Sequence, residues 1–192
     1  MITPFEYVTV LISIILGMGI TQIVSGIAQI IHRWEQTKIY WPHLILILLL
    51  FIIHIQEWWV TYDLRMYQYW RLPVFLFIIL YPVNLYILAR ILFPIRWHRT
   101  SVDLKKFYFD NYRRIYLLII LSAILAIIDN IFIGGYSLTD QAPQIILITI
   151  LSTVIIIRKE TEWIHQVVPL LMLLILIVSF ALSWEKLLIT NS

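Results

Sequence analysis

Cysteine is absent from the 192-residue sequence. Its absence excludes thiolate metal sites, iron–sulfur clusters and disulfide exchange, although it leaves the cellular compartment undetermined. Charged residues are also scarce: they make up 13% of the chain, whereas soluble globular domains carry about a quarter. This shortage of charge indicates that the chain is not a soluble domain.

Sequence motifs of the common catalytic classes are missing as well. The chain contains no HExxH, no GxSxG and no glycine-rich phosphate loop, so an enzyme is the least favoured class of function. The formal net charge of +3 is small and unevenly distributed, which indicates membrane topology rather than binding to nucleic acid. We therefore expect no nucleic-acid partner.

Long apolar runs make up most of the sequence. Hydrophobic residues make up 61% of the chain, and the mean hydropathy is +0.90. Six runs are long enough to cross a bilayer as helices, which takes about 20 residues each. They lie at 5–31, 41–62, 72–93, 113–133, 142–158 and 163–184. The sequence therefore predicts an all-α integral membrane protein with six transmembrane helices, forming a single transmembrane domain over 1–192.

Two finer features concern how these helices are organised. The stretch WPHLILILLL at 41–50 is similar to APQIILITIL at 142–151. Two inverted three-helix repeats, an arrangement common among transporters, would explain the similarity, and so would chance matching of Ile-rich sequence. Between the third and fourth runs, 101–112 has an apolar stripe opposite charged residues, which predicts a short interfacial helix.

Lys and Arg are distributed unequally between the two sides of the membrane. All but three of the 14 basic residues fall on the side that carries the connection near residue 100. Basic residues near span ends stay cytoplasmic, so both termini are expected on the non-cytoplasmic side, in a multi-pass protein of the bacterial inner membrane. The basic segment 94–114 is a candidate site for anionic lipid or a cytoplasmic partner. Its candidate binding residues are Arg96, Arg99, Lys105, Lys106, Arg113 and Arg114.

Polar residues in the outer halves of the spans form the main candidate site. A charge at bilayer depth costs about 2.5–3.5 kcal/mol even on lenient scales, so such residues are functional candidates. His54 and Glu57 lie three residues apart in HIQEWW, which places them on one helix face. The predicted substrate- or ion-binding residues are Glu6, His54, Glu57, Asn84 and Asp129.

A structural role is the alternative for these residues. Trp58 and Trp59 are typical of the aromatic belt at a membrane interface, and a glutamate one turn below the belt can extend to the headgroups. The other polar residues can cap helices or hydrogen-bond neighbouring helices separately.

The inner halves of the first and fifth spans carry uncharged polar residues. We expect either a polar path that continues inward from the outer site or packing between helices, which hydroxylated residues commonly provide. These residues are Thr21, Gln22, Ser25, Thr149, Ser152 and Thr153.

A metal or cofactor is not identified by the sequence. His54 with Glu57, Asp129 and Glu6 would make a nitrogen and oxygen metal site, but HxxE alone is a weak signal. His43 and His165 lie at the inner ends of their spans, where a pair could flank one haem iron.

We therefore expect a small membrane protein that binds or passes a small cation, a proton or a polar solute through the outer polar site. The alternative is a membrane interaction subunit that docks a cytoplasmic partner or anionic lipid through 94–114. The lipid bilayer is a partner in both cases, and self-association is left open.

Overall fold

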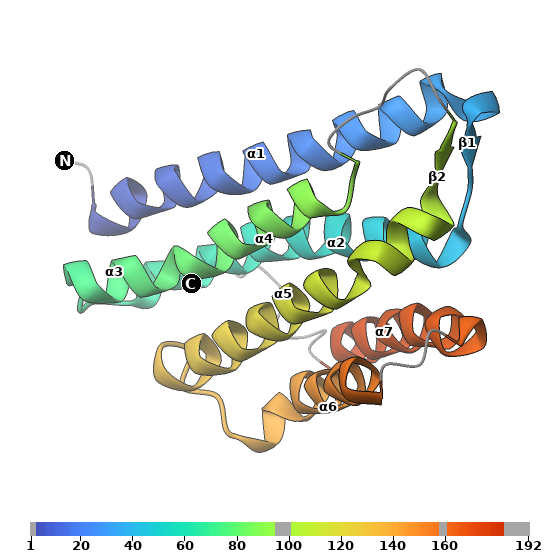
Figure 1. Cartoon of the computed structure of the whole chain (residues 1–192). Helices are drawn as coiled ribbons and strands as arrows, with labels where there is room; N and C mark the ends of the chain where they lie inside the picture. Colours follow the sequence, from blue (N-terminus) through green and yellow to red (C-terminus); the bar gives the residue numbers. More distant parts are fainter. Residues whose placement is uncertain (1–2, 95–100, 158–160, 183–192) are drawn as a thin grey trace.

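The computed structural model describes residues 3–94, 101–157 and 161–182 (Figure 1). Its elements in chain order are α1 (Pro4–His32), η1 (Trp34–Gln36), β1 (Thr37–Lys38), α2 (Trp41–Val60), η2 (Thr61–Met66), α3 (Leu72–Ile78), α4 (Leu80–Ile91), β2 (Val102–Asp103), α5 (Leu104–Phe132), η3 (Thr139–Gln141), α6 (Ala142–Ile157) and α7 (Glu162–Leu182). Six stretches of helix are long and apolar enough to span a membrane. The prediction of an all-α, multi-pass membrane protein is confirmed at this level.

The spans pack as a closed ring. Going around it, α1 contacts α4, α4 contacts α5, α5 contacts α6, α6 contacts α7, α7 contacts α2, and α2 returns to α1. Contacts of α2 with α4 and α5 cross the ring. Thus α2, α4 and α5 all contact one another, and polar side chains on the three helices can meet inside the bundle.

The two ends of the bundle have different connections. At one end, β1 and β2 form a short parallel pair in which Thr37 is opposite Val102 and Lys38 is opposite Asp103. We call this the β-bridge end. The opposite end carries η2, the start of α1 and the connection from α5 to α6, and we call it the η2 end (Figure 1).

The third span is divided into α3 and α4. Pro82 lies in the first turn of α4 and has no N–H to donate to the carbonyl of Ile78, four residues earlier. The helix is interrupted at Ile79, between the two elements. A proline-induced break explains the division.

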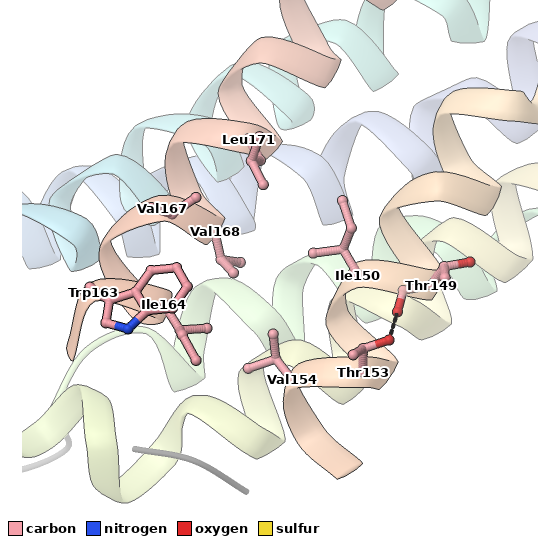
Figure 2. A pocket seen from close by; sticks show the side chains of 9 residues that line it. All are labelled: Thr149, Ile150, Thr153, Val154, Trp163, Ile164, Val167, Val168 and Leu171. Atoms are coloured by element: carbon pink, nitrogen blue, oxygen red, sulfur yellow. Dashed lines mark hydrogen bonds between the residues drawn. The ribbon is translucent and has the colours of Figure 1, made fainter. Parts of the chain in front are cut away.

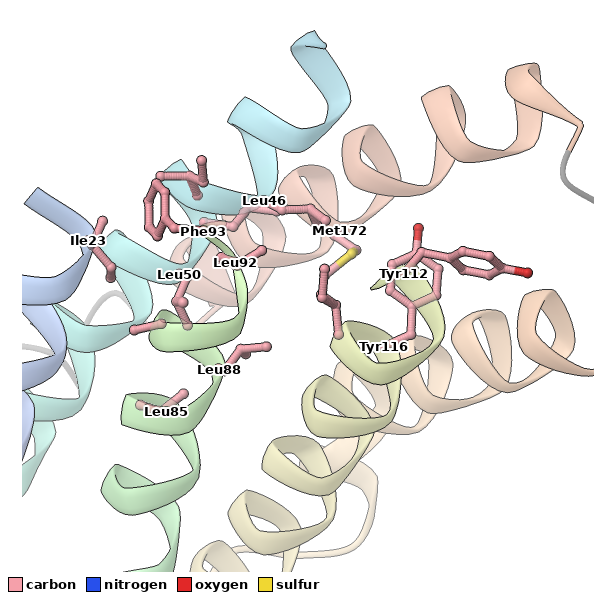
Figure 3. Packing of buried hydrophobic residues seen from close by; sticks show 14 of the residues in the cluster. Ile23, Leu46, Leu50, Leu85, Leu88, Leu92, Phe93, Tyr112, Tyr116 and Met172 are labelled. Atoms are coloured by element: carbon pink, nitrogen blue, oxygen red, sulfur yellow. The ribbon is translucent and has the colours of Figure 1, made fainter. Parts of the chain in front are cut away.

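Glycines allow close helix approach at two points on α1. A Cβ at Gly19 would collide with the imidazole of His54 on α2, and a Cβ at Gly26 would collide with the ring of Phe93. Each glycine therefore makes room for an aromatic ring from a neighbouring segment. Ile23, between these glycines, is part of the buried core that also includes side chains of α2, α4, α5 and α7 (Figure 3).

The interfacial position of the helix over 101–112 is not confirmed. The helix runs on into the fourth span as α5, without interruption from Leu104 to Phe132. The apolar stripe is buried in the bundle, since Leu104, Tyr108 and Tyr112 are each at most 1% exposed. The pattern was amphipathic because the stripe packs against other helices, not because it lies on a lipid surface.

The inverted repeat is not confirmed either. In the first half of the chain, the first and third spans make the most extensive packing, between α1 and α4. In the second half, the first and second spans do so, between α5 and α6. The packing of the two halves therefore differs, and the similarity between 41–50 and 142–151 has no counterpart in it.

Candidate functional site

Two carboxylates and a phenol come together at the η2 end. Glu57 in the last turn of α2 lies close enough to Asp129, near the end of α5, for their charges to interact. Tyr81 at the start of α4 lies within the same electrostatic range of both. All three side chains are partly buried. We call Glu57, Tyr81 and Asp129 the acid site.

One carboxylate oxygen of the acid site is unsatisfied. Oδ1 of Asp129 is buried and has no hydrogen-bond partner among the described residues. A buried carboxylate oxygen normally accepts hydrogen bonds, and leaving it unpaired is costly. Oδ1 of Asp129 is therefore positioned to accept a proton or to coordinate a cation.

A second polar group borders the acid site. Asn130, next to Asp129, donates a hydrogen bond from Nδ2 to Oε1 of Gln141, at 2.9 Å. Nε2 of Gln141 donates in turn to the carbonyl of Ser137, at 3.3 Å. These bonds connect the end of α5, next to Asp129, to η3. They also connect η3 to the segment that joins it to α5.

His54 is not part of the acid site, although it shares a helix face with Glu57 by spacing. Its Nδ1 lies 2.8 Å from the carbonyl of Leu50, which can only accept, so Nδ1 carries the hydrogen. Nε2 points toward Gly19 on α1 and has no partner among the described residues. His54 therefore packs toward α1, whereas Glu57 interacts with α4 and α5.

Glu6 is also separate from the acid site and is exposed. Its carboxylate accepts a hydrogen bond from the backbone N–H of Thr3 at 2.7 Å, and the Thr3 hydroxyl accepts from the N–H of Glu6 at 3.2 Å. This reciprocal capping box begins α1. The structural alternative describes Glu6 correctly.

Asn84 links α4 to α5. Its Nδ2 donates to the carbonyl of Leu118 at 2.9 Å and to the hydroxyl of Ser122 at 2.7 Å. Both bonds cross between helices inside the bundle, as the structural alternative expected. Of the five predicted outer residues, the structure brings Glu57 and Asp129 together and distributes the other three over separate contacts.

The aromatic belt of HIQEWW is present beside the acid site. Trp58 and Trp59 are 55% and 41% exposed. Glu57 precedes them in the chain but interacts with Asp129 across the bundle. The motif therefore combines two exposed tryptophans, as expected of an aromatic belt, with a partly buried carboxylate.

The uncharged residues of the predicted polar path do not line an interior path. Thr21, Ser25, Thr149 and Thr153 are exposed, and Ser152 is half-buried. The hydroxyls of three threonines bond to carbonyls of their own helices: Thr21 to Gly17, Thr149 to Ile145 and Thr153 to Thr149, all within 2.8 Å. Gln22 accepts a bond from Arg90 of α4 at 3.1 Å. These residues serve backbone and interhelical contacts.

Thr149 and Thr153 instead border a groove of about 290 Å³ between α6 and α7 (Figure 2). Apart from the two threonines and Trp163, its lining is aliphatic. Figure 2 shows the Thr153 hydroxyl bonded toward Thr149, so neither hydroxyl is presented as a polar anchor. The groove is suited to an acyl chain rather than to a polar solute.

The basic segment is described in part, because Arg96 and Arg99 lie outside the described residues. Lys105 makes an ion pair with Glu162 of α7 at 2.8 Å. Arg113 donates from Nε to the hydroxyl of Tyr112 at 3.1 Å. The side chains of Lys106 and Arg114 are exposed on the first turns of α5. The described part of the segment thus contributes both to packing between helices and to a basic surface.

An aromatic cluster at the β-bridge end was not predicted. Tyr108, Tyr112 and Tyr116 on α5 are almost completely buried together with His165 of α7 and Tyr40 before α2. The spacing of the three tyrosines, at four and eight residues, places them along one helix face, and this signal was available in the sequence. The sequence pattern placed Tyr108 and Tyr112 on the apolar stripe of 101–112, and the charged residues opposite that stripe favoured an interfacial interpretation.

The predicted pair His43 and His165 does not face across an open space. Both rings pack against Tyr108 at angles of 74° and 83°. Nε2 of His43 donates to the carbonyl of Leu92 at 2.9 Å, because that carbonyl can only accept. Among the described residues, no group of three or more His, Asp or Glu side chains is arranged to hold a metal ion.

Comparison with known proteins finds no matching family, no matching characterised protein and no matching solved structure. The chemistry of the residues themselves therefore carries the functional assignment.

Proposed function

We propose that the chain is a multi-pass membrane protein that binds and passes a proton at the acid site formed by Glu57, Asp129 and Tyr81. The supporting observation is the pairing of two carboxylates inside a membrane bundle, with a buried oxygen of Asp129 left unpartnered. From the basic side of the chain, we propose that the η2 end faces away from the cytoplasm of a bacterial cell.

The proposed function of the acid site depends on repulsion between the carboxylates of Glu57 and Asp129. Two unit charges about 4 Å apart repel by about 4 kcal/mol at the effective dielectric constant of about 20 that suits many protein sites. A proton shared between the carboxylates, or a cation between them, removes that repulsion. Binding of a proton therefore lowers the repulsion at the acid site, which supports its assignment as the proton-binding site.

A proton fits the ligand set better than a metal cation or a larger solute. Ca²⁺ takes about 6–8 oxygen ligands and Mg²⁺ requires octahedral coordination. The acid site offers the carboxylates of Glu57 and Asp129 and the hydroxyl of Tyr81. Two oxygens suffice to share one proton, so we assign the proton as cargo and treat a small cation as the alternative.

The test is proton flux into liposomes that contain the purified protein and a pH-sensitive dye, driven by a potassium diffusion potential. Glu57→Gln and Asp129→Asn preserve side-chain size and remove the charge. Each should lower the flux by about 100-fold or more, in line with loss of a group that transfers protons. Replacing sodium by choline should leave the wild-type flux unchanged.

The matched control is Glu35→Gln, because Glu35 is exposed in η1 and lies outside the acid site. Its flux should equal that of the wild type. Full flux in both acid-site variants would contradict the proposal, and a sodium-dependent current would replace the proton by a cation.

A lipid-binding role at the basic segment is the second candidate. The exposed side chains of Lys106 and Arg114 give the β-bridge end a basic surface on α5. Each basic residue near an anionic leaflet contributes about 1 kcal/mol of attraction. We assign this surface to anionic lipid headgroups, which is compatible with proton transfer at the other end.

A further inference from the structure

The aromatic cluster at the β-bridge end contains a chain of hydrogen bonds between two helices. The hydroxyls of Tyr116 and Tyr108 on α5 are 2.5 Å apart. The hydroxyl of Tyr108 lies 3.0 Å from Nδ1 of His165 on α7. Tyr108, Tyr116 and His165 are each 0% exposed. Three groups that can donate and accept protons are therefore connected without intervening solvent.

The hydroxyls of this chain can all point the same way, so that a proton can be passed along it in one direction. When Nδ1 of His165 accepts from Tyr108, the hydroxyl oxygen of Tyr108 is free to accept from Tyr116. Each phenol then has its hydrogen directed toward the histidine. Rotation of the two hydroxyls reverses the direction without moving either helix.

Tyr40 packs against Tyr108 beside the chain, with ring centroids 5.3 Å apart. Its hydroxyl is buried without a hydrogen-bond partner among the described residues, yet its charge would interact with those of Tyr108 and Tyr116. Burial and the neighbouring carboxylate of Glu162 raise the pKa of Tyr40 to about 12. Glu162 is 47% exposed on its side chain and forms the ion pair with Lys105. The hydroxyl of Tyr40 is thus within electrostatic reach of a surface carboxylate.

Other titratable groups surround the chain without joining it. His43 of α2 packs against Tyr108 and bonds to the carbonyl of Leu92. Tyr112 on α5 packs against Tyr108 and Tyr116. Its hydroxyl accepts a hydrogen bond from Arg113. These neighbours provide matched positions for control variants.

The same helix carries the chain at one end and the acid site at the other. Tyr116 and Asp129 are separated along α5 by about 20 Å, from a rise of about 1.5 Å per residue. Between them, Ser122 accepts the hydrogen bond from Asn84. A proton held at the acid site and a second group of proton-transferring residues therefore share one helix across the bundle.

We propose that Tyr116, Tyr108 and His165 form a proton relay at the β-bridge end. The proposal rests on the proposed function in one respect, since it takes the proton as cargo. In the transfer, Tyr116 gives its hydroxyl proton to the oxygen of Tyr108, and Tyr108 gives its own proton to Nδ1 of His165. The transfer leaves Tyr116 as a phenolate and His165 as an imidazolium. A hydronium ion returns a proton to Tyr116 and a water molecule takes one from His165, so protons balance and no electrons are exchanged.

The first test compares proton flux in the same liposomes for Tyr108→Phe, Tyr116→Phe and Tyr112→Phe. Phenylalanine keeps the buried ring in each case and removes only the hydroxyl. Loss of a relay hydroxyl should lower the flux at least about tenfold, whereas the variant at Tyr112 should retain it. Equal flux in all three variants overturns the relay and leaves the cluster as a packing element.

A second measurement separates the relay from the proposed function. In lipid nanodiscs, ¹⁵N NMR of labelled histidine reports the exchange of the ring protons of His165 with bulk water, without any transport. The relay predicts that Tyr116→Phe slows this exchange at least about tenfold relative to Tyr112→Phe. Unchanged exchange overturns the relay even when Glu57→Gln abolishes flux. Slowed exchange supports the relay even in a protein that shows no flux.

Discussion

The two ends of α5 place polar groups in the membrane in contrasting ways. At the β-bridge end, Tyr108, Tyr116 and His165 hydrogen-bond one another. At the η2 end, Glu57 and Asp129 are like charges with an oxygen of Asp129 left unpartnered. Buried polar groups that hydrogen-bond one another stabilise a bundle, whereas a buried carboxylate oxygen without a partner costs stability. Under the proposed function, the η2 end is the place where a proton binds.

The largest effect on stability is expected from truncation at the β-bridge end. Tyr108→Ala removes a fully buried ring and leaves a cavity among Tyr40, Tyr112 and His165. By analogy with other aromatic truncations, it should lower the free energy of unfolding by about 3–5 kcal/mol. Thermal unfolding in detergent micelles measures the loss. A change below about 1 kcal/mol would show that the cluster is not part of the packed core.

A smaller effect is expected from high pH, again at the β-bridge end. The pKa of Tyr40 is raised from 10.0 to about 12 by burial and by Glu162. Between these values the unfolded chain loses the proton and the folded chain retains it, so the stabilisation is fully present below pH 10 and declines as pH rises toward 12. The decline should be at most about 2.7 kcal/mol, the equivalent of two pKa units.

Thermal unfolding across pH 9 to 12 measures this effect, with Tyr40→Phe as the variant that should reduce the dependence. Tyr69 is 74% exposed, so Tyr69→Phe serves as the control and should leave the pH dependence unchanged. An identical pH dependence in the Tyr40 variant and the wild type would contradict the assignment.

The smallest effect on stability is expected at the η2 end. Asp129→Asn removes one of two like charges, so the free energy of unfolding should stay unchanged or rise by about 1 kcal/mol while proton flux is lost. Asn84→Ala provides the contrast, because it removes two satisfied interhelical hydrogen bonds. That variant should be less stable by about 1–2 kcal/mol. A marked loss of stability in the Asp129 variant would indicate a structural role for the carboxylate.

Hydropathy predicted the number of spans because backbone groups in lipid must be hydrogen-bonded within a helix. It misplaced the start of α5. Lys105 and Lys106 lower the average hydropathy of a turn whose other face buries Leu104 and Tyr108. An average over a window cannot distinguish a charged outer face from a buried inner one.

The candidate site was predictable only in part for a related reason. Depth along the membrane can be counted from the sequence, and it placed Glu57 and Asp129 at a similar level. The direction in which a side chain points around the helix depends on packing between helices. Gly19 leaves room for the imidazole of His54 against α1, and the backbone N–H of Thr3 donates a hydrogen bond to the carboxylate of Glu6. Neither contact is visible in a pattern of apolar residues.

The break at Pro82 has a mechanical consequence for the acid site. Since Pro82 has no N–H to offer Ile78, tilting α3 about the break does not require that hydrogen bond to be broken. Tyr81 is the residue immediately before this proline, so the phenol of the acid site lies at the pivot. The seven residues of α3 are therefore joined to α4 by one backbone hydrogen bond fewer than an unbroken helix would have, while α4 is packed against α1 and α5.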